Sequence, residues 1–263
     1  MNALTMEQIQ QTAPSVFATQ PYEGMSSRYR FIPTSGVIDA MRERGFVPVR
    51  ATQSRVRIEG NKEFAKHVIR FRRLIDLDAP VDSEVVESVL ENAHNGTSAY
   101  IWMFGLWRVR CGNGLVVASS TINEIHVRHS GSPTLAQEVA EASLDIMDEA
   151  PSVIRTVEDW KRIQLTEPQQ IAYADSAKQL RDSSIDVDPR SLLNVRRFRD
   201  GGNDLWSTFN RVQENIIKGG NIGRNTKGNR VHTRSIKSVT EDLRVNRALW
   251  QLTEKMKELV TKN

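Results

Sequence analysis

Apolar and basic residues alternate along two segments of the N-terminal half, residues 46–60 and 67–77. A period of two is typical of strands that keep one face in the core and the other in water. The sequence therefore predicts two half-buried strands whose wet face is almost uniformly positive. The arginines expected on that face are Arg55, Arg57, Arg70 and Arg72.

The most apolar part of the chain follows these strands. The Asn-Gly pair in "HNGT" (94–97) favours a tight hairpin turn, and "AYIWMFGLWRVR" (99–110) is typical of a buried strand. Gly105 inside that strand indicates a bulge or a close backbone approach. "CGNGL" (111–115) marks a second turn before a further apolar run.

Helical spacing dominates after residue 134. The first twenty residues are also expected to hold a short helix and a tether, and another helix is expected from a cap at Thr34 or Ser35 to Gly45. Pro151 is expected to kink or break the first of the later helices, and residues 182–204 are expected to be a linker around a short turn. The later helices are predicted over residues 134–165, 167–180, 203–218 and 238–260.

Strands first and helices later predict an α+β fold, with an antiparallel sheet in the N-terminal half packed by helices of the C-terminal half. The 263 residues suffice for one large domain or two modest ones. We expect an N-terminal arm (1–24), a β-rich core (25–133) and a helical part (134–263) that is continuous with the core. No internal repeat is present.

Charge is segregated along the chain, although the net charge is only +4. Residues 42–73 hold ten Lys and Arg against three Glu, whereas residues 76–91 hold six acids and no base. Residues 138–159 are acidic as well, and the glycine-rich segment 218–237 holds six Lys and Arg and no acid. Such blocks can form a positive surface patch that attracts polyanions.

We therefore expect a nucleic-acid interface. Alternate residues of a strand lie about 7 Å apart, near the phosphate repeat of an extended nucleic-acid strand. Segment 218–237 is expected to be a mobile loop that closes over this track. The proposed contacts are Arg55, Arg57, Lys62, Lys66, Arg70, Arg72, Lys218, Arg224, Lys227, Arg230, Arg234 and Lys237.

Structural explanations stand beside this hypothesis. The arginines can simply keep an exposed sheet soluble, or pair with the acidic segments, which are themselves expected to face the basic flank of a neighbouring protomer. Aromatic residues of the apolar strand can stack on bases or belong to the core. These aromatic residues are Tyr100, Trp102 and Trp107.

Catalytic signatures are weak, so we expect no catalytic residue, no metal and no cofactor. Lys227 does not fit a phosphate-binding loop, because a helix precedes the loop and Thr precedes the Lys. Cys111 is the single cysteine, which excludes an internal disulfide and fits a reducing cytoplasm. His126 and His129 could share a metal only with ligands from far away. With no run of about 18 apolar residues and no secretion signal, neither membrane insertion nor export is expected.

Four stretches carry a family resemblance: "ENAHNGTSAY", "LWRVRCGNGLVVAS", "HVRHSG" and "LWSTFNRVQENIIKGG". In this order they resemble a widespread phage- and plasmid-encoded family that is usually labelled a domain of unknown function or a phage/plasmid-like protein. The resemblance spans about residues 25–260, and its most specific pieces are 108–115 and 209–214. Where the family usually has Asp, this chain has Asn95, so no catalytic role is expected there. The resemblance implies mobile-element biology.

In outline the chain is also similar to single-strand annealing proteins of the Red-beta and RecT type. The leading hypothesis is a DNA-binding protein that anneals or recombines single-stranded DNA as a homo-oligomer, a ring or a filament, with a phage exonuclease as a possible partner. An alternative is a counter-defence or host-takeover protein that binds a host protein. A nuclease that uses a divalent metal is a third hypothesis, for which the sequence offers no clear carboxylate cluster.

Overall fold

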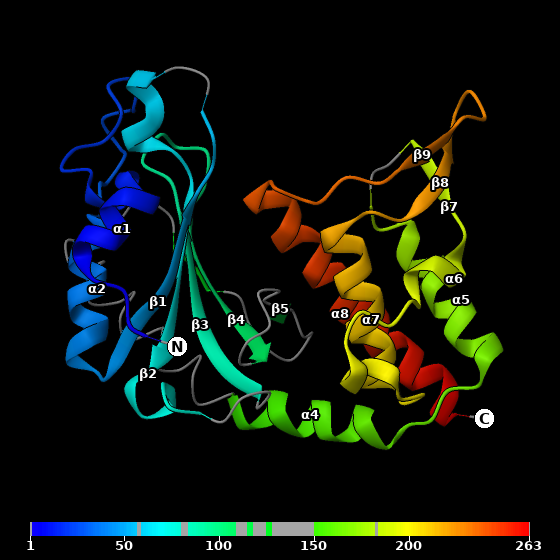
Figure 1. Cartoon of the computed structure of the whole chain (residues 1–263). Coiled ribbons are helices and arrows are strands. Elements are labelled where there is room, and N and C mark those ends of the chain that lie inside the picture. The colour runs from blue at the N-terminus through cyan, green and yellow to red at the C-terminus, as the bar shows by residue number, and fades with distance from the viewer. Residues whose placement is uncertain are drawn as a thin grey trace. The chain divides into compact units, whose positions relative to one another are not determined.

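The structure is a computed structural model that describes residues 2–56, 59–79, 84–108, 115–117, 125–127, 150–181 and 184–262. The chain forms two compact units, the first ending at Ala150 and the second beginning at Pro151. Each unit has its own sheet (Figure 1). Strands dominate the first unit and helices the second, which confirms the predicted α+β class.

The first unit is built on an antiparallel sheet. Its strands run in the order β1-β2-β3-β4-β5, and β6 also pairs with β4. The turn between β3 and β4 falls at "HNGT", as predicted, with Gly96 at a φ of 73°. The strands are β1 (Phe46–Gln53), β2 (His67–Arg73), β3 (Glu84–Asn92), β4 (Tyr100–Arg108), β5 (Leu115–Val117) and β6 (Ile125–Val127).

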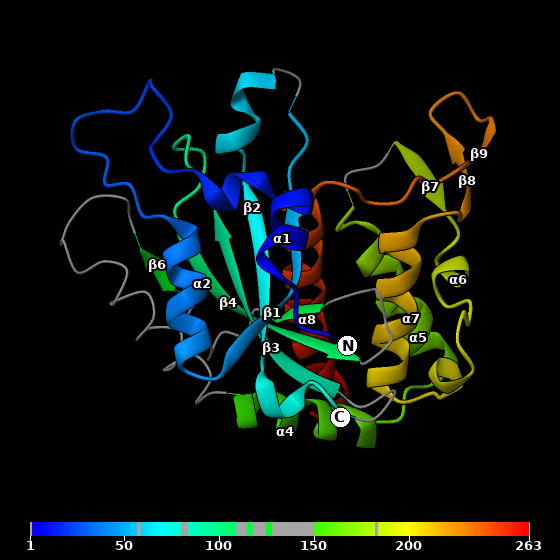
Figure 2. The same cartoon turned by 60° about the vertical axis from the view of Figure 1, so that its left-hand side comes forward.

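Helices α1 (Met6–Thr12) and α2 (Thr34–Glu43) lie on the same face of this sheet (Figures 1 and 2). They bury apolar residues of both helices, including Ile9, Val37 and Met41. The N-terminal residues were expected to form an arm, but α1 and the 3-10 turn Pro14–Phe17 contribute to the core of the unit. Two further 3-10 turns cover Glu59–Phe64 and Leu74–Asp76.

A buried polar network joins α2 to the sheet. The Thr34 hydroxyl lies 3.0 Å from Nε2 of His67 and 3.2 Å from the Tyr100 hydroxyl, and it accepts a hydrogen bond from Asn92 at 3.0 Å. Ser15 closes the other side of the His67 ring, 2.8 Å from Nδ1. The predicted capping role of Thr34 is therefore wrong: the N-cap is Pro33, and the hydroxyl serves the core.

The second unit packs helices around tryptophan residues. The rings of Trp160 on α4 and Trp250 on α8 lie 4.4 Å apart, and Trp206 stacks on Phe209 of α7 at 5.2 Å. The helices are α4 (Ala150–Arg162), α5 (Glu167–Lys178), α6 (Pro189–Leu192), α7 (Leu205–Lys218) and α8 (Val239–Thr261). A 3-10 turn covers Phe198–Gly201.

Helices α5, α7 and α8 confirm their predicted ranges, and α7 is capped by Asp204 and ends at Gly219. Residues 134–149 lie outside the described residues. The expected linker at 182–204 is only partly right, because it contains strand β7 (Ile185–Val187). With β8 (Ile222–Asn225) and β9 (Arg230–His232), β7 forms a small antiparallel sheet in the order β7-β8-β9.

The buried His67 predicts an acid-sensitive first unit. Burial lowers the pKa of His67 from 6.5 to about 4. At a pH between these two values, His67 therefore binds a proton in the unfolded chain but not in the folded chain. The free energy of unfolding is expected to fall by roughly 3 kcal/mol as the pH drops from 6.5 to 4. Urea unfolding across this range measures the fall, and His67→Gln should remove most of it. His232→Gln, at an exposed site, is the control; equal slopes for both variants would contradict the assignment.

Candidate nucleic-acid interface

Arg70 and Arg72 of β2 do not face water. Their residues are 7% and 0% exposed, and both guanidinium groups bind the same carboxylate, that of Glu87 on β3. Nε of Arg70 donates to Oε2 at 2.6 Å, and Nε of Arg72 donates to Oε1 at 2.9 Å. The expectation that these arginines line a wet face is therefore wrong, because β2 is an inner strand whose alternating side chains are buried on both faces.

The acidic segment 76–91 neutralises the basic strand beside it. Besides Glu87, Glu91 pairs with Lys66, whose Nζ lies 2.5 Å from Oε1. Asp76 receives a hydrogen bond from Arg73 at 2.7 Å. The antiparallel pairing of β2 with β3 brings the two charge blocks side by side within one chain, so these acids are not reserved for a neighbouring protomer.

The proposed stacking residues Tyr100 and Trp102 are core residues. Both are 0% exposed. The Tyr100 hydroxyl donates to the carbonyl of Ile32 at 3.1 Å, and the ring of Trp102 lies 5.8 Å from that of Phe71. Neither ring can reach a base without unfolding the sheet. The side chain of Trp107 lies outside the described residues.

Among the described residues, the other proposed cations of the first unit do not lie on strands. Strand β1 ends at Gln53, so the exposed Arg55 belongs to an irregular segment. Arg57 lies outside the described residues. Lys62 is exposed on the 3-10 turn after this segment. The predicted alternation over residues 54–56 gives no strand, because pairing with β2 stops at His67.

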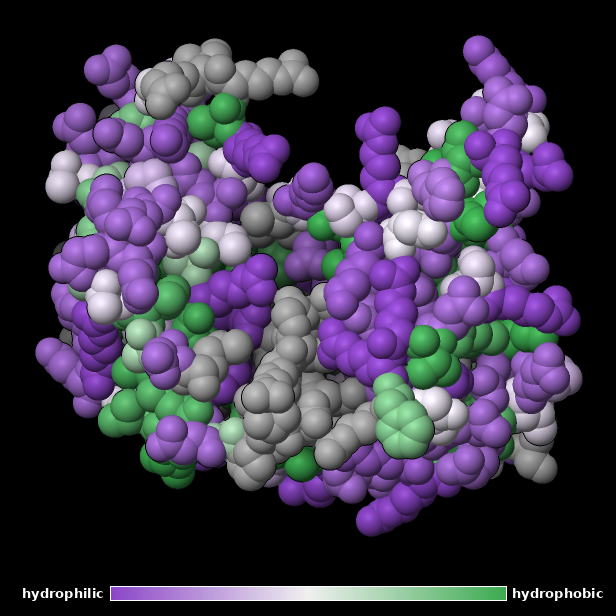
Figure 3. All heavy atoms as spheres, viewed as in Figure 1, coloured by the Kyte–Doolittle hydropathy of each residue, from purple (hydrophilic) through white to green (hydrophobic). Residues whose placement is uncertain are grey.

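In the second unit, the hairpin β8–β9 and the residues after it carry five of the proposed cations. Arg224 of β8 and Arg230 of β9 are direct cross-strand neighbours, and both are exposed. Lys227 in the turn, and Arg234 and Lys237 after β9, are exposed as well. Among the described residues, none of these five forms an ion pair, whereas Lys218 pairs with Glu214. Hydrophilic residues cover the hairpin at the upper right of Figure 3. We call Arg224, Lys227, Arg230, Arg234 and Lys237 the hairpin cations.

The hairpin is ordered, in contrast to the mobile loop expected from the sequence. Oδ1 of Asn225 accepts hydrogen bonds from the backbone N–H groups of Lys227 and Asn229, both at 3.0 Å. The N–H of Gly228, which has a φ of 79°, donates to the Asn225 carbonyl at 2.8 Å. An Asn side chain that binds its own turn in this way fixes the turn.

The C-terminus of α7 anchors the hairpin. Gly219 has a φ of 65°, and a Cβ there would lie 2.5 Å from the carbonyl oxygen of Arg234, so only glycine fits. Two arginines bind the last carbonyls of the helix. Arg196 donates to Gly219 at 2.5 Å, and Arg181 donates to Ile216 at 3.0 Å.

The "FNRVQE" motif of α7 (209–214) serves this framework. Arg211 donates to Gln170 at 2.8 Å, and Gln213 donates to Asn246 at 2.9 Å. Glu214, buried, receives a hydrogen bond from Arg197 at 3.0 Å. These side chains tie α7 to its neighbours, so the motif contributes to the framework that holds the hairpin.

In the part of the chain that the structure describes, no group of three or more His, Cys, Asp and Glu residues could hold a metal ion. Its described helices also include none that is both long and apolar enough to cross a membrane. Cys111 and His129 lie outside the described residues. His126 lies on β6, opposite Ile101 of β4.

Comparison with known proteins gives matches over most of the chain. A family model described as a domain of unknown function, DUF932, matches residues 21–250. The UPF0380 protein YafZ of Escherichia coli K12 is 38% identical over 253 residues, which is 95% of this chain and 90% of that protein. The UPF0380 protein YfjQ of the same organism is 37% identical over the same shares. No solved structure matches. The family resemblance is confirmed, and the similarity in outline to annealing proteins stays a prediction.

The buried charge cluster gives a prediction for stability. Glu87→Gln keeps the shape of the side chain but leaves two buried guanidinium groups without their counter-charge, which is expected to lower the free energy of unfolding by about 3–5 kcal/mol. Asp76→Asn is the matched control, because its partner Arg73 is half exposed and the loss should stay below about 1 kcal/mol. Urea unfolding, followed by hydrogen exchange of the β2 and β3 amides, measures both. Equal losses in the two variants would show that the cluster does not stabilise the sheet.

Proposed function

This chain belongs to the DUF932 family, and we propose that it binds nucleic acid through the hairpin cations of its second unit. The observation that carries the proposal is the direct pairing of Arg224 with Arg230 across β8 and β9, both exposed and neither paired with a described carboxylate. Like charges directly opposite each other destabilise a sheet. A polyanion that binds both guanidinium groups removes this repulsion.

The chemistry of these groups fits phosphate. Arginine offers a planar fork of N–H donors that matches phosphate oxygens, and three of the five hairpin cations are arginines. Their chain positions spread them from the turn to the residues after β9, so that successive phosphates of one strand can meet them. Contacts of this kind hold a strand by its backbone without reading its sequence.

Single-stranded DNA is our preferred ligand, and strand annealing or recombination is the finer proposal. A protein that holds the backbone and leaves base edges exposed can present a strand to its complement without a catalytic residue. Annealing in this way needs two strands held close together, so we propose that copies of the chain assemble into a ring or a filament. Arg70 and Arg72 of the first unit do not belong to this interface, because both are committed to Glu87.

The double variant Arg224→Gln/Arg230→Gln tests the interface. Each phosphate contact to a single strand contributes about 0.7 to the slope of log affinity against log salt, so the slope should fall by roughly 1.4 and binding should weaken most at low salt. Fluorescence anisotropy with a labelled oligonucleotide, titrated at several salt concentrations, measures both quantities.

The matched control is Arg155→Gln/Arg162→Gln, which removes two exposed arginines of α4 and the same amount of charge. Unchanged affinity and slope in the hairpin variant would refute the interface. An equal loss of affinity in both variants would show that binding depends on the net charge of the protein and not on the hairpin. A pull-down from nuclease-treated host lysate tests the other function: stoichiometric recovery of one host protein, with no oligonucleotide binding, would favour a host-protein ligand.

A further inference from the structure

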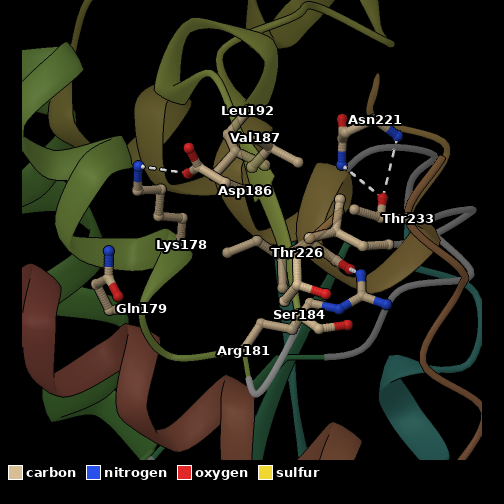
Figure 4. A pocket seen from close by; sticks show the side chains of 12 residues that line it. Lys178, Gln179, Arg181, Ser184, Asp186, Val187, Leu192, Asn221, Thr226 and Thr233 are labelled. Atoms are coloured by element: carbon tan, nitrogen blue, oxygen red, sulfur yellow. Dashed lines mark hydrogen bonds and ion pairs between the residues drawn. The ribbon is translucent and has the colours of Figure 1, made fainter. Parts of the chain in front are cut away.

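A cavity of about 350 Å³ lies next to the hairpin, within the second unit. Residues of α5, β7, the end of α7 and the hairpin line it (Figure 4). It lies at the lower end of the range for ligand pockets, roughly 300–1,000 Å³. The volume suits one nucleotide and not a base pair.

The floor of the cavity is apolar, and its rim is polar. Val187, Leu192 and Ile216 are buried, and their aliphatic side chains offer surfaces for the faces of a flat ring. The rim residues, by contrast, are exposed and carry hydroxyl or amide groups. These rim residues are Gln179, Ser184 and Thr226.

Buried polar groups complete the wall toward the hairpin. The N–H of Asn221 donates to the Thr233 hydroxyl at 3.1 Å, and the N–H of Thr233 donates to the Asn221 carbonyl at 2.9 Å. Figure 4 shows this pair on one side and the Lys178–Asp186 ion pair, 3.2 Å long, on the other. These hydrogen bonds fix the wall, so the cavity is formed before any ligand arrives.

Arg181 supplies a positive charge at the same cavity. Its Nη1 donates to the Ile216 carbonyl at 3.0 Å and its Nη2 donates to the Arg234 carbonyl, which holds the guanidinium in place. A guanidinium has five N–H donors, and these two hydrogen bonds leave other N–H groups of Arg181 available to a ligand. A fixed, partly exposed cation next to an apolar slot matches a phosphate that is linked to a flat ring.

We propose that this cavity takes up one unpaired nucleotide of a strand held by the hairpin, with its base between the aliphatic residues of the floor and its phosphate toward Arg181. This inference rests on the proposed function. Thr226 and Thr233 belong to the cavity while Lys227, Arg230 and Arg234 belong to the hairpin cations, so a strand on the hairpin passes the mouth of the cavity. A base enters at least cost when it is already unpaired, which makes the cavity a source of preference for single strands.

An oligonucleotide with one 2-aminopurine tests the cavity. Binding to the natural chain should raise the fluorescence, because the base leaves its stacked neighbours, and the single strand should bind at least about tenfold more tightly than a duplex of equal length. The variant Ser184→Leu/Thr226→Leu narrows the mouth with larger side chains that fill the entrance and cannot hydrogen-bond to a base. It should lose the fluorescence rise and bring the affinity ratio close to one, while duplex binding and its salt slope stay unchanged.

The matched control is Ser176→Leu/Thr240→Leu, at exposed helix positions that do not line the cavity. It should behave as the natural chain does. If the variant Ser184→Leu/Thr226→Leu keeps both the fluorescence rise and the preference for single strands over duplex, the inference is overturned. Equal binding of single and double strands by the natural chain, with no fluorescence change, would overturn it too and leave the hairpin interface in place. No binding of either ligand at low salt would remove both proposals.

Discussion

The cost of burying an unpaired charge decides which cations of this chain can meet a ligand. The fully buried carboxylate of Glu87 forms ion pairs with the guanidinium groups of both Arg70 and Arg72. Removing a charge from water costs several kcal/mol unless a partner offsets it, so these arginines are committed to the sheet. Burial lowers the pKa of Arg70, and the carboxylate of Glu87 opposes that shift. The cations left for a polyanion are those that no described carboxylate neutralises, and the hairpin gathers five of them.

The same rule explains why the charge blocks of the sequence mislead. A basic block followed by an acidic block suggests a patterned surface with a complementary partner. In an antiparallel hairpin, however, consecutive strands are spatial neighbours. The acidic side chains of β3 therefore lie next to the basic side chains of β2 and pair with them. Block charge on adjacent strands is thus evidence of internal pairing. The hairpin β8–β9 differs, because neither strand carries an acid and only Asp186 of β7 lies opposite Arg224.

Much of the fold was predictable because it depends on local signals. The Asn-Gly turn, the cap at Asp204 and the glycine after α7 are short patterns with a direct physical cause. The predictions that failed depend on tertiary context: period-two alternation shows which residues share a face of a strand but not whether that face is covered.

Strand β7 was missed because three residues are too few to show a period, although Ile185 and Val187 alternate around Asp186. The hairpin cations were predicted, but strands β8 and β9 and the hydrogen-bonded turn between them were not. The turn at Asn225 has the composition of any polar loop. The cavity left no sequence signal, because its residues come from α5, β7, α6, α7 and the hairpin, which are separate in the sequence.

A pair of facing arginines on such a small sheet needs support from elsewhere. Strands of three or four residues contribute little stability alone, and Arg224 beside Arg230 subtracts from it. The support comes from the framework of α7, where Gly219 permits the sharp exit and Arg181 and Arg196 bind the carbonyls around it. Gly223 lets β7 approach closely, since a Cβ there would lie 2.3 Å from the Asp186 carbonyl. The unit thus holds the two arginines side by side against their mutual repulsion, and the polyanion that we propose as ligand would relieve this repulsion on binding.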